Sequence, residues 1–520
     1  MKRRAFLEGM TGATILGQAK TRLRRSEAAA AAQGAETPEN QYNGVRDFFY
    51  RPDNAWLGDV IPFCKDGVFR LFYLHDWRDK TKHGEGTDWY QVSTQNFVRF
   101  TEHGEMLARG TTEEQDLSVA TGSVIEANGR YHIFYTGFNS VLQKQGKPDQ
   151  GVMHAVSDDL LKWRKIPEDT FFAPTAIYER DDWRDPFVFW NAENREYWML
   201  VAARLKSGPS RRRGCTALCV SKDLTKWEVR EPFWAPSLYY THECPDLFKM
   251  GEWWYLVFSE FSESFLTRYR MSKNLKGPWV APENDTFDGR AYYAAKTASD
   301  GRRRFIFGWN PTRADNKDSQ NWQWGGNMVV HEVVQGTDGT LSVRVPESVD
   351  RGFSNAIAFK FNPGIGSCEI GQNAVKILAP YSFACAAAGT MPDRCKITAT
   401  VEFTGNTHGC GIMLRVSNDV EKAYYVRLDP TRNRLVFDSW PRAGDVPFMV
   451  ELERPIALTP GRPVELKVIV DGTIAEVYTA GKIAMSTRMY DLNQGAWGLF
   501  VSEGSANFRD IGFYGYSERS

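Results

Sequence analysis

The stretch Trp56-Leu57-Gly58-Asp59, followed by the run Val68-Phe69-Arg70-Leu71-Phe72-Tyr73-Leu74, decides how the rest of the chain is interpreted. The aromatic and β-branched composition of the second stretch predicts a β-strand. Gly58, a residue that favours turns, precedes this strand in the chain, and Asp59 directly follows Gly58. A carboxylate at such a point can face a central cavity instead of bulk water. Asp is also a favoured turn former, so the choice depends on what recurs elsewhere in the chain.

Short aromatic runs of the same kind recur along the chain, which is typical of a repeat architecture. They occupy residues 69–74, 131–136, 197–202, 253–258 and 304–309. Four of them are followed by a second motif that ends in a polar corner, at residues 92–97, 156–160, 220–224 and 271–275. Each unit therefore predicts a strand, a turn and a second strand, which cannot bury both faces alone. We expect five such units to form a five-bladed β-propeller over residues 41–346, with unrelated sandwich strands as the alternative.

The character of the sequence changes after Pro346. Alternating strands follow with frequent turn signals, and residues 464–470 run into Asp471-Gly472, a hairpin signal. This pattern predicts a β-sandwich over residues 347–520. The expected fold class is therefore all-β, a five-bladed propeller followed by a C-terminal sandwich.

Composition narrows the classes of partner. Lys+Arg and Asp+Glu both number 64, so the balanced charge argues against a nucleic-acid partner. The aromatic content of 13% suits β cores and faces that hold sugar rings. No apolar stretch is long enough to span a bilayer, so no membrane partner is expected. The sequence does not indicate an oligomeric state.

Eight cysteines show no paired C-x-x-C spacing, which argues against a zinc site of that type. Their even number permits disulfides without establishing any pairing. The better candidates for disulfides cluster in the C-terminal part: Cys368, Cys385, Cys395 and Cys410.

The first residues contain a candidate targeting signal. Lys2-Arg3-Arg4-Ala5-Phe6-Leu7 resembles the twin-arginine export signal, and a weakly apolar stretch follows at residues 9–17. Ala28 to Ala32 offer small residues at a candidate cleavage point. Four basic residues at 20–25 leave a disordered basic leader as the alternative. We expect residues 1–40 to be a leader and the protein to be exported to the periplasm or the exterior.

Two further acids occupy places comparable to that of Asp59. Arg184-Asp185-Pro186 precedes the strand-like residues 187–190, and His242-Glu243-Cys244-Pro245 precedes Leu247-Phe248. A propeller gathers equivalent strands around one funnel, so we expect the three acids to meet there. Arg-Asp-Pro alone is often a turn with a local ion pair, and specificity lies in the joint pattern.

Carboxylates brought together in this way suit glycoside hydrolysis. That reaction needs one ionised carboxylate and one carboxyl group that holds a proton. Charge pairing with Arg184 would keep Asp185 ionised.

On these motifs the chain resembles the family-32 glycoside hydrolases, which include invertases, inulinases and levanases. The family's stretch Trp-Met-Asn-Asp-Pro-Asn-Gly keeps its Trp and its Asp here as Trp56 and Asp59, while Arg-Asp-Pro and Glu-Cys are complete. Weaker matches lie at residues 121–123, 288–294, 308–309 and 470–478. The resemblance implies that Asp59 is the nucleophile, Glu243 the acid/base and Asp185 the transition-state stabiliser. It also implies retaining cleavage of β-fructofuranosides, with the Asp59 and Glu243 carboxyls about 5–5.5 Å apart.

The chain departs from the family pattern around the expected sugar pocket. Val60-Ile61-Pro62 replaces Pro-Asn-Gly, Leu74-His75-Asp76 stands where a Gln is usual, and residues 88–91 replace Trp-Gly-His. The hypothesised substrate-binding residues are Trp56, His75, Asp76, Ser123, Arg184 and Tyr293. The expected partner is a carbohydrate substrate, and the chemistry needs no metal or organic cofactor.

Other functions remain open on the sequence alone. A related five-bladed arabinosidase or xylosidase would invert configuration and keep its carboxyls further apart. A fructosyltransferase would share the covalent intermediate, and a sugar-binding propeller could have lost catalysis. Release of fructose from sucrose, inulin and levan, with Asp59→Ala as control, separates these functions.

Overall fold

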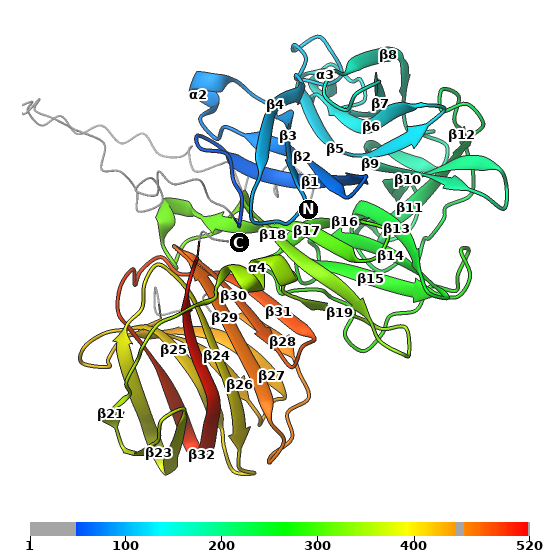
Figure 1. Cartoon of the computed structure of the whole chain (residues 1–520). Helices are drawn as coiled ribbons and strands as arrows, with labels where there is room; N and C mark the ends of the chain where they lie inside the picture. The colour runs from blue at the N-terminus through cyan, green and yellow to red at the C-terminus, as the bar shows by residue number, and fades with distance from the viewer. Residues whose placement is uncertain (1–47, 443–451, 518–520) are drawn as a thin grey trace, which may run out of the picture.

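The structure is a computed structural model that describes residues 48–442 and 452–517. Within these residues, five blades of antiparallel strands form a β-propeller, at the upper right of Figure 1. A β-sandwich follows at the lower left of the same view. The all-β architecture predicted from the repeats is therefore confirmed.

Each blade is built from strands that are consecutive in the chain. Blade I consists of β1 (Trp56–Lys65), β2 (Val68–Asp76), β3 (Asp88–Thr94) and β4 (Thr101–Leu107). Blade II consists of β5 (Ser118–Ala127), β6 (Arg130–Phe138), β7 (Gln150–Ser157) and β8 (Arg164–Phe171). Blade III consists of β9 (Tyr178–Asn191), β10 (Glu196–Leu205), β11 (Gly214–Ser221) and β12 (Glu228–Val229).

Blade IV consists of β13 (Glu243–Met250), β14 (Trp253–Glu260) and β15 (Leu266–Ser272). Blade V consists of β16 (Tyr293–Ser299), β17 (Arg304–Arg313), β18 (Trp322–Gln335) and β19 (Leu341–Arg344). Short helical turns lie in the loops: α2 (Lys80–His83), α3 (Ser140–Lys144), η2 (Ser210–Arg212) and η3 (Ala314–Asn316).

The aromatic runs that defined the repeat form the second strand of each blade: β2, β6, β10, β14 and β17. The polar corners end the third strands and cap their own turns. The Ser157 hydroxyl accepts the amide of Leu160 at 3.0 Å, and Ser221 accepts that of Leu224 at 2.9 Å. The corner thus satisfies backbone donors while its leucine enters the core.

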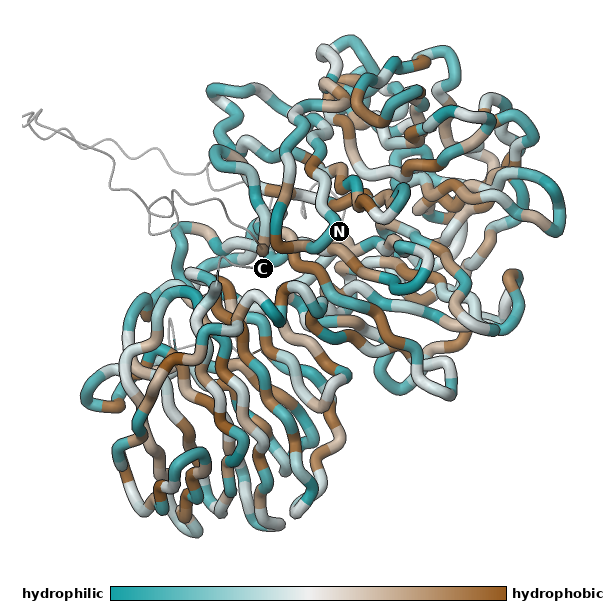
Figure 2. The backbone as a smooth tube through the Cα atoms, in the orientation of Figure 1, coloured by the Kyte–Doolittle hydropathy of each residue, from teal (hydrophilic) through white to brown (hydrophobic). Residues whose placement is uncertain are grey.

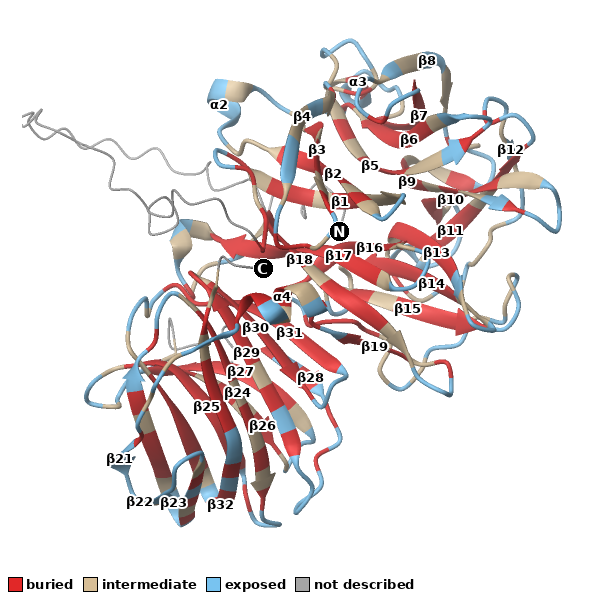
Figure 3. Cartoon of the chain, in the orientation of Figure 1, coloured by how far each residue is buried: buried red, intermediate tan, exposed pale blue. Residues whose placement is uncertain are grey.

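Apolar side chains fill the spaces between adjacent blades. Phe72 and Ile133 pack between blades I and II, while Phe134 and Met199 pack between blades II and III. Figure 3 shows that the central parts of the strands are buried, whereas exposed residues concentrate in the turns. Packing blade against blade thereby covers both faces of each small sheet.

The propeller closes where its first and last blades meet. β1 pairs with β18 at Leu57 and Gly326, so blades I and V form one continuous sheet. The amide of Met328 donates to the carbonyl of Tyr50 at 2.8 Å, and Asn327 Nδ2 donates to that of Phe49 at 2.8 Å. The segment before β1 is thus fastened to blade V.

The helix α4 (Glu347–Gly352) follows blade V and leads into the sandwich. The sandwich strands are β20 (Asn355–Ala356), β21 (Asn362–Ile365), β22 (Ser367–Ile370), β23 (Ala374–Thr390), β24 (Arg394–Phe403), β25 (Gly409–Val416), β26 (Ala423–Asp429), β27 (Arg434–Trp440), β28 (Leu452–Pro455), β29 (Val464–Asp471), β30 (Ile474–Thr479), β31 (Ile483–Arg488) and β32 (Ala496–Gly515). The long strand β32 pairs first with β25 and then with β24, which joins both layers into one hydrogen-bonded sheet. Apolar and polar residues alternate along these strands in Figure 2, as expected for strands with one buried face.

The eight cysteines all lie within the described residues and are free. Among the disulfide candidates, Cys368 lies near Cys385, but its Sγ donates to the Cys385 carbonyl at 3.3 Å. Cys395 and Cys410 are buried in the sandwich core, where a thiol packs as a small apolar group. None of the helices in the described part of the chain is long and apolar enough to cross a membrane.

Candidate active site

A β-bulge recurs in the innermost strand of each blade. Asp59 and Asp185 lie at two of these bulges, and Glu243 immediately precedes a third. Strand pairing is irregular between Leu57 and Val60 in β1, which leaves Gly58 and Asp59 at the bulge. The corresponding bulge residues in the other blades are Thr121, Asp185-Pro186, Cys244-Pro245 and Ala294-Ala295. Bulges re-aim side chains and are common beside active sites.

The acids therefore lie within the inner strands and not before them, which corrects the expectation from the sequence. Asp59 is in β1, Asp185 is in β9, and Glu243 begins β13. Gly58 and the two prolines that follow the other acids resemble turn residues in sequence. In the structure they occupy bulge positions, where a missing side chain or a missing amide hydrogen is tolerated.

The backbone at these bulges adopts an uncommon conformation. Asp185, Cys244 and Ala294 have φ values of 58°, 52° and 53°, in the left-handed region. Hydrogen bonds hold the first of them, because the Asp185 amide donates to Thr136 Oγ1 at 2.7 Å. Strained residues of this kind persist where their surroundings fix them, and they cluster at functional sites.

Cys244 brings the three acids together. Its amide donates to Asp185 Oδ2 at 3.0 Å, and its thiol donates to Asp59 Oδ2 with an Sγ–Oδ2 distance of 3.7 Å. Glu243 is its neighbour in the chain. Burial raises the pKa of the thiol well above its usual value, and Asp59 raises it further, so Cys244 remains a neutral donor. Three carboxyl groups from blades I, III and IV thus share one site.

Asp59 is held by donors from two other blades. The hydroxyl of Thr121 donates to Oδ2, and the Trp309 indole Nε1 donates to Oδ1 at 2.9 Å. Burial raises the pKa of Asp59 to about 6, although both hydrogen bonds act to lower it. Asp59 is therefore ionised near neutral pH, while its carboxylate is poorly solvated and fixed in orientation.

Arg184 supplies the positive charge of the site. Its Nη2 donates to Glu243 Oε1 at 2.9 Å, and its Nε lies 3.8 Å from Asp185 Oδ2. Burial alone would lower the Arg184 pKa, but the carboxylates of Asp182, Glu243 and Asp185 outweigh it and raise the pKa. The expectation that Arg184 pairs with Asp185 holds, and the shorter contact is to Glu243.

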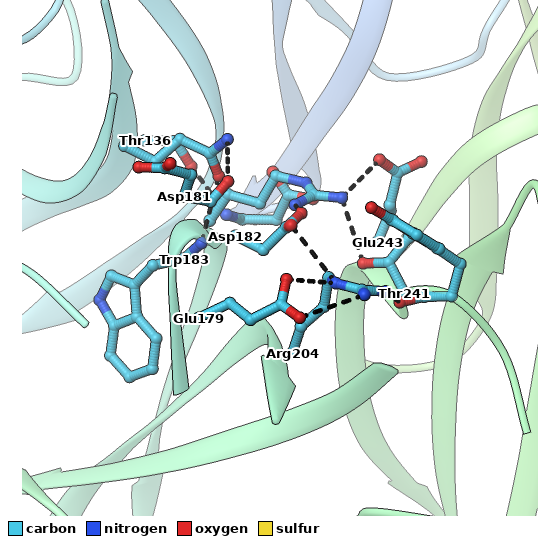
Figure 4. A network of polar contacts seen from close by, with 12 residues as sticks. Thr136, Glu179, Asp181, Asp182, Trp183, Arg204, Thr241 and Glu243 are labelled. Carbon is cyan, nitrogen blue, oxygen red and sulfur yellow. Dashed lines mark hydrogen bonds and ion pairs between the residues drawn. The ribbon is translucent and has the colours of Figure 1, made fainter. Parts of the chain in front are cut away.

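Acidic and basic side chains alternate in the network that continues from Arg184 away from Glu243 (Figure 4). Arg184 Nη1 lies 2.5 Å from Asp182 Oδ1, and Arg204 Nε lies 3.5 Å from Asp182 Oδ2. Arg204 in turn pairs with Glu179 at 2.8 Å. The network fixes the guanidinium of Arg184 in a position that a single ion pair would leave less well defined.

Glu243 has a second partner and reaches solvent. The Tyr293 hydroxyl donates to Glu243 Oε2 at 2.8 Å, while 15% of the Glu243 side chain is exposed. The Tyr293 ring stacks on Phe265 with centroids 4.1 Å apart. Burial and then the Glu243 charge raise the Tyr293 pKa, so the hydroxyl keeps its proton.

The predicted pocket residues Trp56 and Asp76 lie at the junction of blades I and V. The Trp56 ring lies between the guanidinium groups of Arg51 and Arg78, 4.3 and 4.4 Å from its centroid. Asp76 accepts hydrogen bonds from the backbone amide and Nε of Arg78 at 3.0 and 3.4 Å. Arg78 also donates to the Trp324 carbonyl at 3.1 Å, which links the two blades.

His75 and Ser123 occupy different surroundings. The buried His75 ring stacks on Tyr90 at 3.9 Å, and neither ring nitrogen has a hydrogen-bond partner. Burial lowers the His75 pKa to about 4, so the imidazole is neutral at pH 7. Ser123 Oγ accepts the Val188 amide at 3.0 Å and thereby ties blade II to blade III.

Several residues of the site carried no assigned role in the sequence analysis. Thr121 and Trp309 lie in stretches that match the family pattern only weakly, and no sequence pattern marks Lys296. Lys296 Nζ donates to the carbonyls of Gly122 at 3.0 Å and Pro245 at 3.1 Å. Burial lowers the pKa of this lysine, whereas the nearby acids oppose the shift. It joins the inner strands of blades II and IV.

Trp324 explains why residue 58 is a glycine. A Cβ atom added at Gly58 would lie 2.1 Å from Cη2 of Trp324, far inside contact distance. The indole therefore packs against the backbone immediately before Asp59, and its ring centroid lies 6.2 Å from that of Trp309. No local sequence pattern connects residues so far apart in the chain.

A five-bladed propeller with three carboxyl groups converging on its inner strands, one of them partly exposed, defines a glycoside hydrolase. The profile described as "Glycosyl hydrolases family 32 N-terminal domain" matches residues 49–343, and "Glycosyl hydrolases family 32 C terminal" matches residues 379–515. The chain belongs to this family.

Curated relatives include the sucrose-6-phosphate hydrolase of Vibrio alginolyticus, 25% identical over 336 residues, which cover 58% of this chain and 63% of the relative. The levanbiose-producing levanase of Bacillus subtilis (strain 168) is 23% identical over 324 residues, which cover 57% of this chain and 56% of the levanase. The chain thus spans less than two thirds of the length of these two relatives. The crystal structure of fructan 1-exohydrolase IIa from Cichorium intybus shares the fold, with a TM-score of 0.70 and 17% sequence identity. The match covers 90% of this chain and 96% of the exohydrolase chain.

Proposed function

We propose that the protein hydrolyses β-fructofuranosidic linkages in sucrose, fructo-oligosaccharides or fructans. The observation that carries this proposal is the contact of Cys244 with both Asp59 and Asp185, beside Glu243. Membership of the family supports the reaction class. The names of the relatives, a sucrose-6-phosphate hydrolase, a levanase and a fructan exohydrolase, support the substrate class.

The proposed reaction is a retaining double displacement. Asp59 attacks the anomeric carbon while Glu243 protonates the leaving oxygen, which gives a covalent fructosyl-enzyme intermediate. Glu243 then takes a proton from water, and the water releases fructose with retained configuration. Thr121 and Trp309 hold the Asp59 carboxylate, so that little reorientation is needed at the moment of attack.

Asp185 and Arg184 serve the charge that develops during this reaction. Asp185 is buried and fixed by the Cys244 amide, so its negative charge can stabilise the oxocarbenium-like transition state. Arg184 and Tyr293 bind different oxygens of Glu243 and orient it towards the leaving group. The Asp59–Glu243 carboxyl separation of about 5–5.5 Å remains a prediction of this mechanism.

His75 is the strongest candidate among the proposed pocket residues for a direct contact to sugar. It lies in the stretch Leu74-His75-Asp76 that stands where the family usually has a Gln, and its neutral imidazole offers one donor and one acceptor without present partners. Ring hydroxyls supply the complementary groups. We propose that Trp56 and Asp76 shape the pocket near Arg78, and that Ser123 acts by fixing blade II.

Product analysis with a matched pair of variants tests the proposed function. Fructose release is measured from sucrose, inulin and levan, with an arabinofuranoside as the competing substrate. Asp59→Asn should abolish release, whereas Asp66→Asn, in the exposed turn of the same hairpin, should retain it. Turnover of the arabinoside alone, or equal activity of Asp59→Asn, would overturn the proposal. Methyl fructoside formed in methanol should retain the β configuration.

We also propose that the leader directs export. Residues 1–40 lie outside the described residues, and the support is the sequence Lys2-Arg3-Arg4-Ala5-Phe6-Leu7. A reporter fused after residue 47 should leave the cytoplasm, and changing both Arg3 and Arg4 to Lys should retain it there. Export of both fusions to the same extent would remove the twin-arginine assignment.

A further inference from the structure

A second cluster of ionisable side chains lies buried between the propeller and the sandwich. Asp288 precedes β16, His331 lies on β18, and Glu476 lies on β30 of the sandwich. Their exposed fractions are 1%, 0% and 0%. One nitrogen or oxygen atom from each lies within 4.8 Å of the others. Tyr292 and Tyr478 of the adjacent hydrophobic core contact the cluster, which has no part in the reaction proposed above.

Asp288 and His331 are already oriented by hydrogen bonds. Asp288 Oδ1 accepts the Ser486 amide at 2.8 Å, and Oδ2 lies 2.9 Å from His331 Nε2. The other ring nitrogen, Nδ1, lies 2.9 Å from the Tyr478 hydroxyl. Ser486 is the outer partner of Asp288, also through its hydroxyl at 2.6 Å from Oδ2, and Tyr478 is the outer partner of His331, as is typical of preorganised metal ligands. A bound ion would replace the direct contact between His331 Nε2 and Asp288 Oδ2.

Two polar groups at the cluster have no partner. Neither carboxyl oxygen of Glu476 makes a hydrogen bond, because the hydroxyl of Ser486, which faces Glu476 across the strand pair, donates to Asp288 Oδ2 instead. The Tyr292 hydroxyl makes none either. Tyr292 is 1% exposed, and its ring centroid lies 5.0 Å from that of His331. Burying a carboxylate without a partner is strongly unfavourable. Unsatisfied groups from both domains at one place therefore indicate a shared ligand.

The charge of the cluster gives the sign of that ligand. Asp288 and Glu476 are two acids, and the nearby buried cation Arg454 donates through Nη1 and Nη2 to groups other than these acids. Arg454 Nη1 donates to the Ala484 carbonyl at 2.7 Å, and Nη2 donates to the Thr286 carbonyl at 3.0 Å. A positively charged ligand would offset the remaining negative charge.

We propose that Asp288, His331 and Glu476 bind one divalent cation that joins the propeller to the sandwich. One imidazole and two carboxylates form a ligand set that Zn²⁺ accepts, with bonds of about 2.0–2.2 Å. Ligand atoms around a tetrahedral Zn²⁺ lie about 3.3–3.5 Å apart, so small side-chain rotations would bring the three atoms, now within 4.8 Å of one another, to bonding positions. The Tyr292 hydroxyl can bind a water in the remaining position. Because Tyr293 follows Tyr292 and contacts Glu243, the ion would also steady the start of β16.

Metal content and heat stability of the full-length protein test the proposal. Chelator-treated protein is titrated with Zn²⁺, Mn²⁺, Ca²⁺ and Mg²⁺ separately, and bound metal is counted after gel filtration. We expect one equivalent of Zn²⁺ to be retained and the unfolding temperature to rise in its presence. No uptake of any of the four ions, with an unchanged unfolding temperature, would overturn the proposal.

Variants separate the site from adventitious binding. Glu476→Gln keeps the shape of the side chain and should weaken Zn²⁺ binding at least tenfold, as should His331→Gln. Glu465→Gln, exposed on the neighbouring strand β29, should bind like the wild type. If Glu476→Gln keeps full Zn²⁺ binding, the ion lies elsewhere and the proposal fails. The proposal also fails if neither Glu476→Gln nor the wild type binds metal and the variant is as stable as the chelated wild type. Glu476 would then be protonated in the folded protein.

Discussion

The propeller funnel and the domain interface each bury acids, but they satisfy them differently. In the funnel, Asp59 receives donors at both oxygens, and Glu243 contacts both Arg184 and Tyr293. At the interface, Glu476 is fully buried and has no hydrogen-bond partner. Protein groups supply the hydrogen bonds of the two funnel acids, and the funnel opens to solvent. At the interface, by contrast, the Glu476 carboxyl group needs a bound ion or a proton to offset its charge. Neutralising an acid should therefore remove activity in the funnel and change ion-dependent stability at the interface.

The largest effect is expected from Asp59→Asn. Losing the proposed nucleophile should lower kcat by roughly 10⁴-fold or more. The same change should stabilise the fold at pH 8, because burial raises the Asp59 pKa from 3.8 to about 6. A raised pKa contributes stability below pH 3.8, and that contribution is lost as the pH rises through 6. The variant should thus gain roughly 2–3 kcal/mol over the wild type at pH 8 and almost nothing at pH 3.5.

Activity assays and urea unfolding at the two pH values check both parts of this prediction. Asp66→Asn, on the exposed turn between β1 and β2, is the matched control and should change neither quantity. A variant that lost activity together with stability at pH 8 would contradict the assignment, because the acid would then be structural.

Arg184→Met should give the next largest effect. The substitution leaves the carboxylates of Asp182 and Glu243 without the cation they share, which should cost about 3–5 kcal/mol of folding stability. We also expect kcat/KM to fall by roughly 10²–10³-fold, because Glu243 loses its orientation and the site loses its positive charge. Arg180→Met is the control, since Arg180 pairs with Asp181 at a partly exposed position. It should cost about 1 kcal/mol or less. Similar losses for both variants would show that Arg184 has no special role.

The sequence predicted the features that local patterns encode. Aromatic strands repeat in each blade and polar corners that begin with Ser in four of the five, because strand periodicity and turn chemistry are properties of neighbouring residues. The equivalent positions of Asp59, Asp185 and Glu243 followed from that repeat. Turn and bulge could not be told apart, because Gly and Pro favour both.

Contacts between distant segments had no local signal. Trp324 over Gly58 depends on how blade V closes against blade I, and the Asp288–His331–Glu476 cluster depends on how two domains dock. These arrangements are set by packing and not by the period of any one stretch. The match of Val470-Asp471-Gly472 to the family pattern marked the strand pair but gave no reason to single out Glu476.

Gly58→Ala tests how closely the funnel depends on its packing. The new methyl group would displace Trp324 or the backbone beside Asp59, and a misplacement of about 1 Å can cost roughly 10²-fold in rate. We expect kcat/KM to fall by about 10- to 100-fold, with partial recovery in the double variant Gly58→Ala/Trp324→Ala. Gly405→Ala, which adds its methyl group in open space in the sandwich, is the control. A double variant no better than the single one would show that Trp324 is not the obstacle.

Trp309→Phe should give the smallest effect and the sharpest distinction between the two buried sites. The indole donates to Asp59 Oδ1 and favours the ionised carboxylate, so its removal should raise the Asp59 pKa above its present value of about 6. Since ionised Asp59 is the proposed nucleophile, the acid limb of kcat/KM should move up by about one pH unit. Activity should then fall about tenfold at low pH and little at pH 8. Trp497→Phe removes a buried indole whose nitrogen has no partner in the sandwich, so its pH profile should match the wild type. A limb that stayed in place would mean that another group in the funnel sets the ionisation on which activity depends.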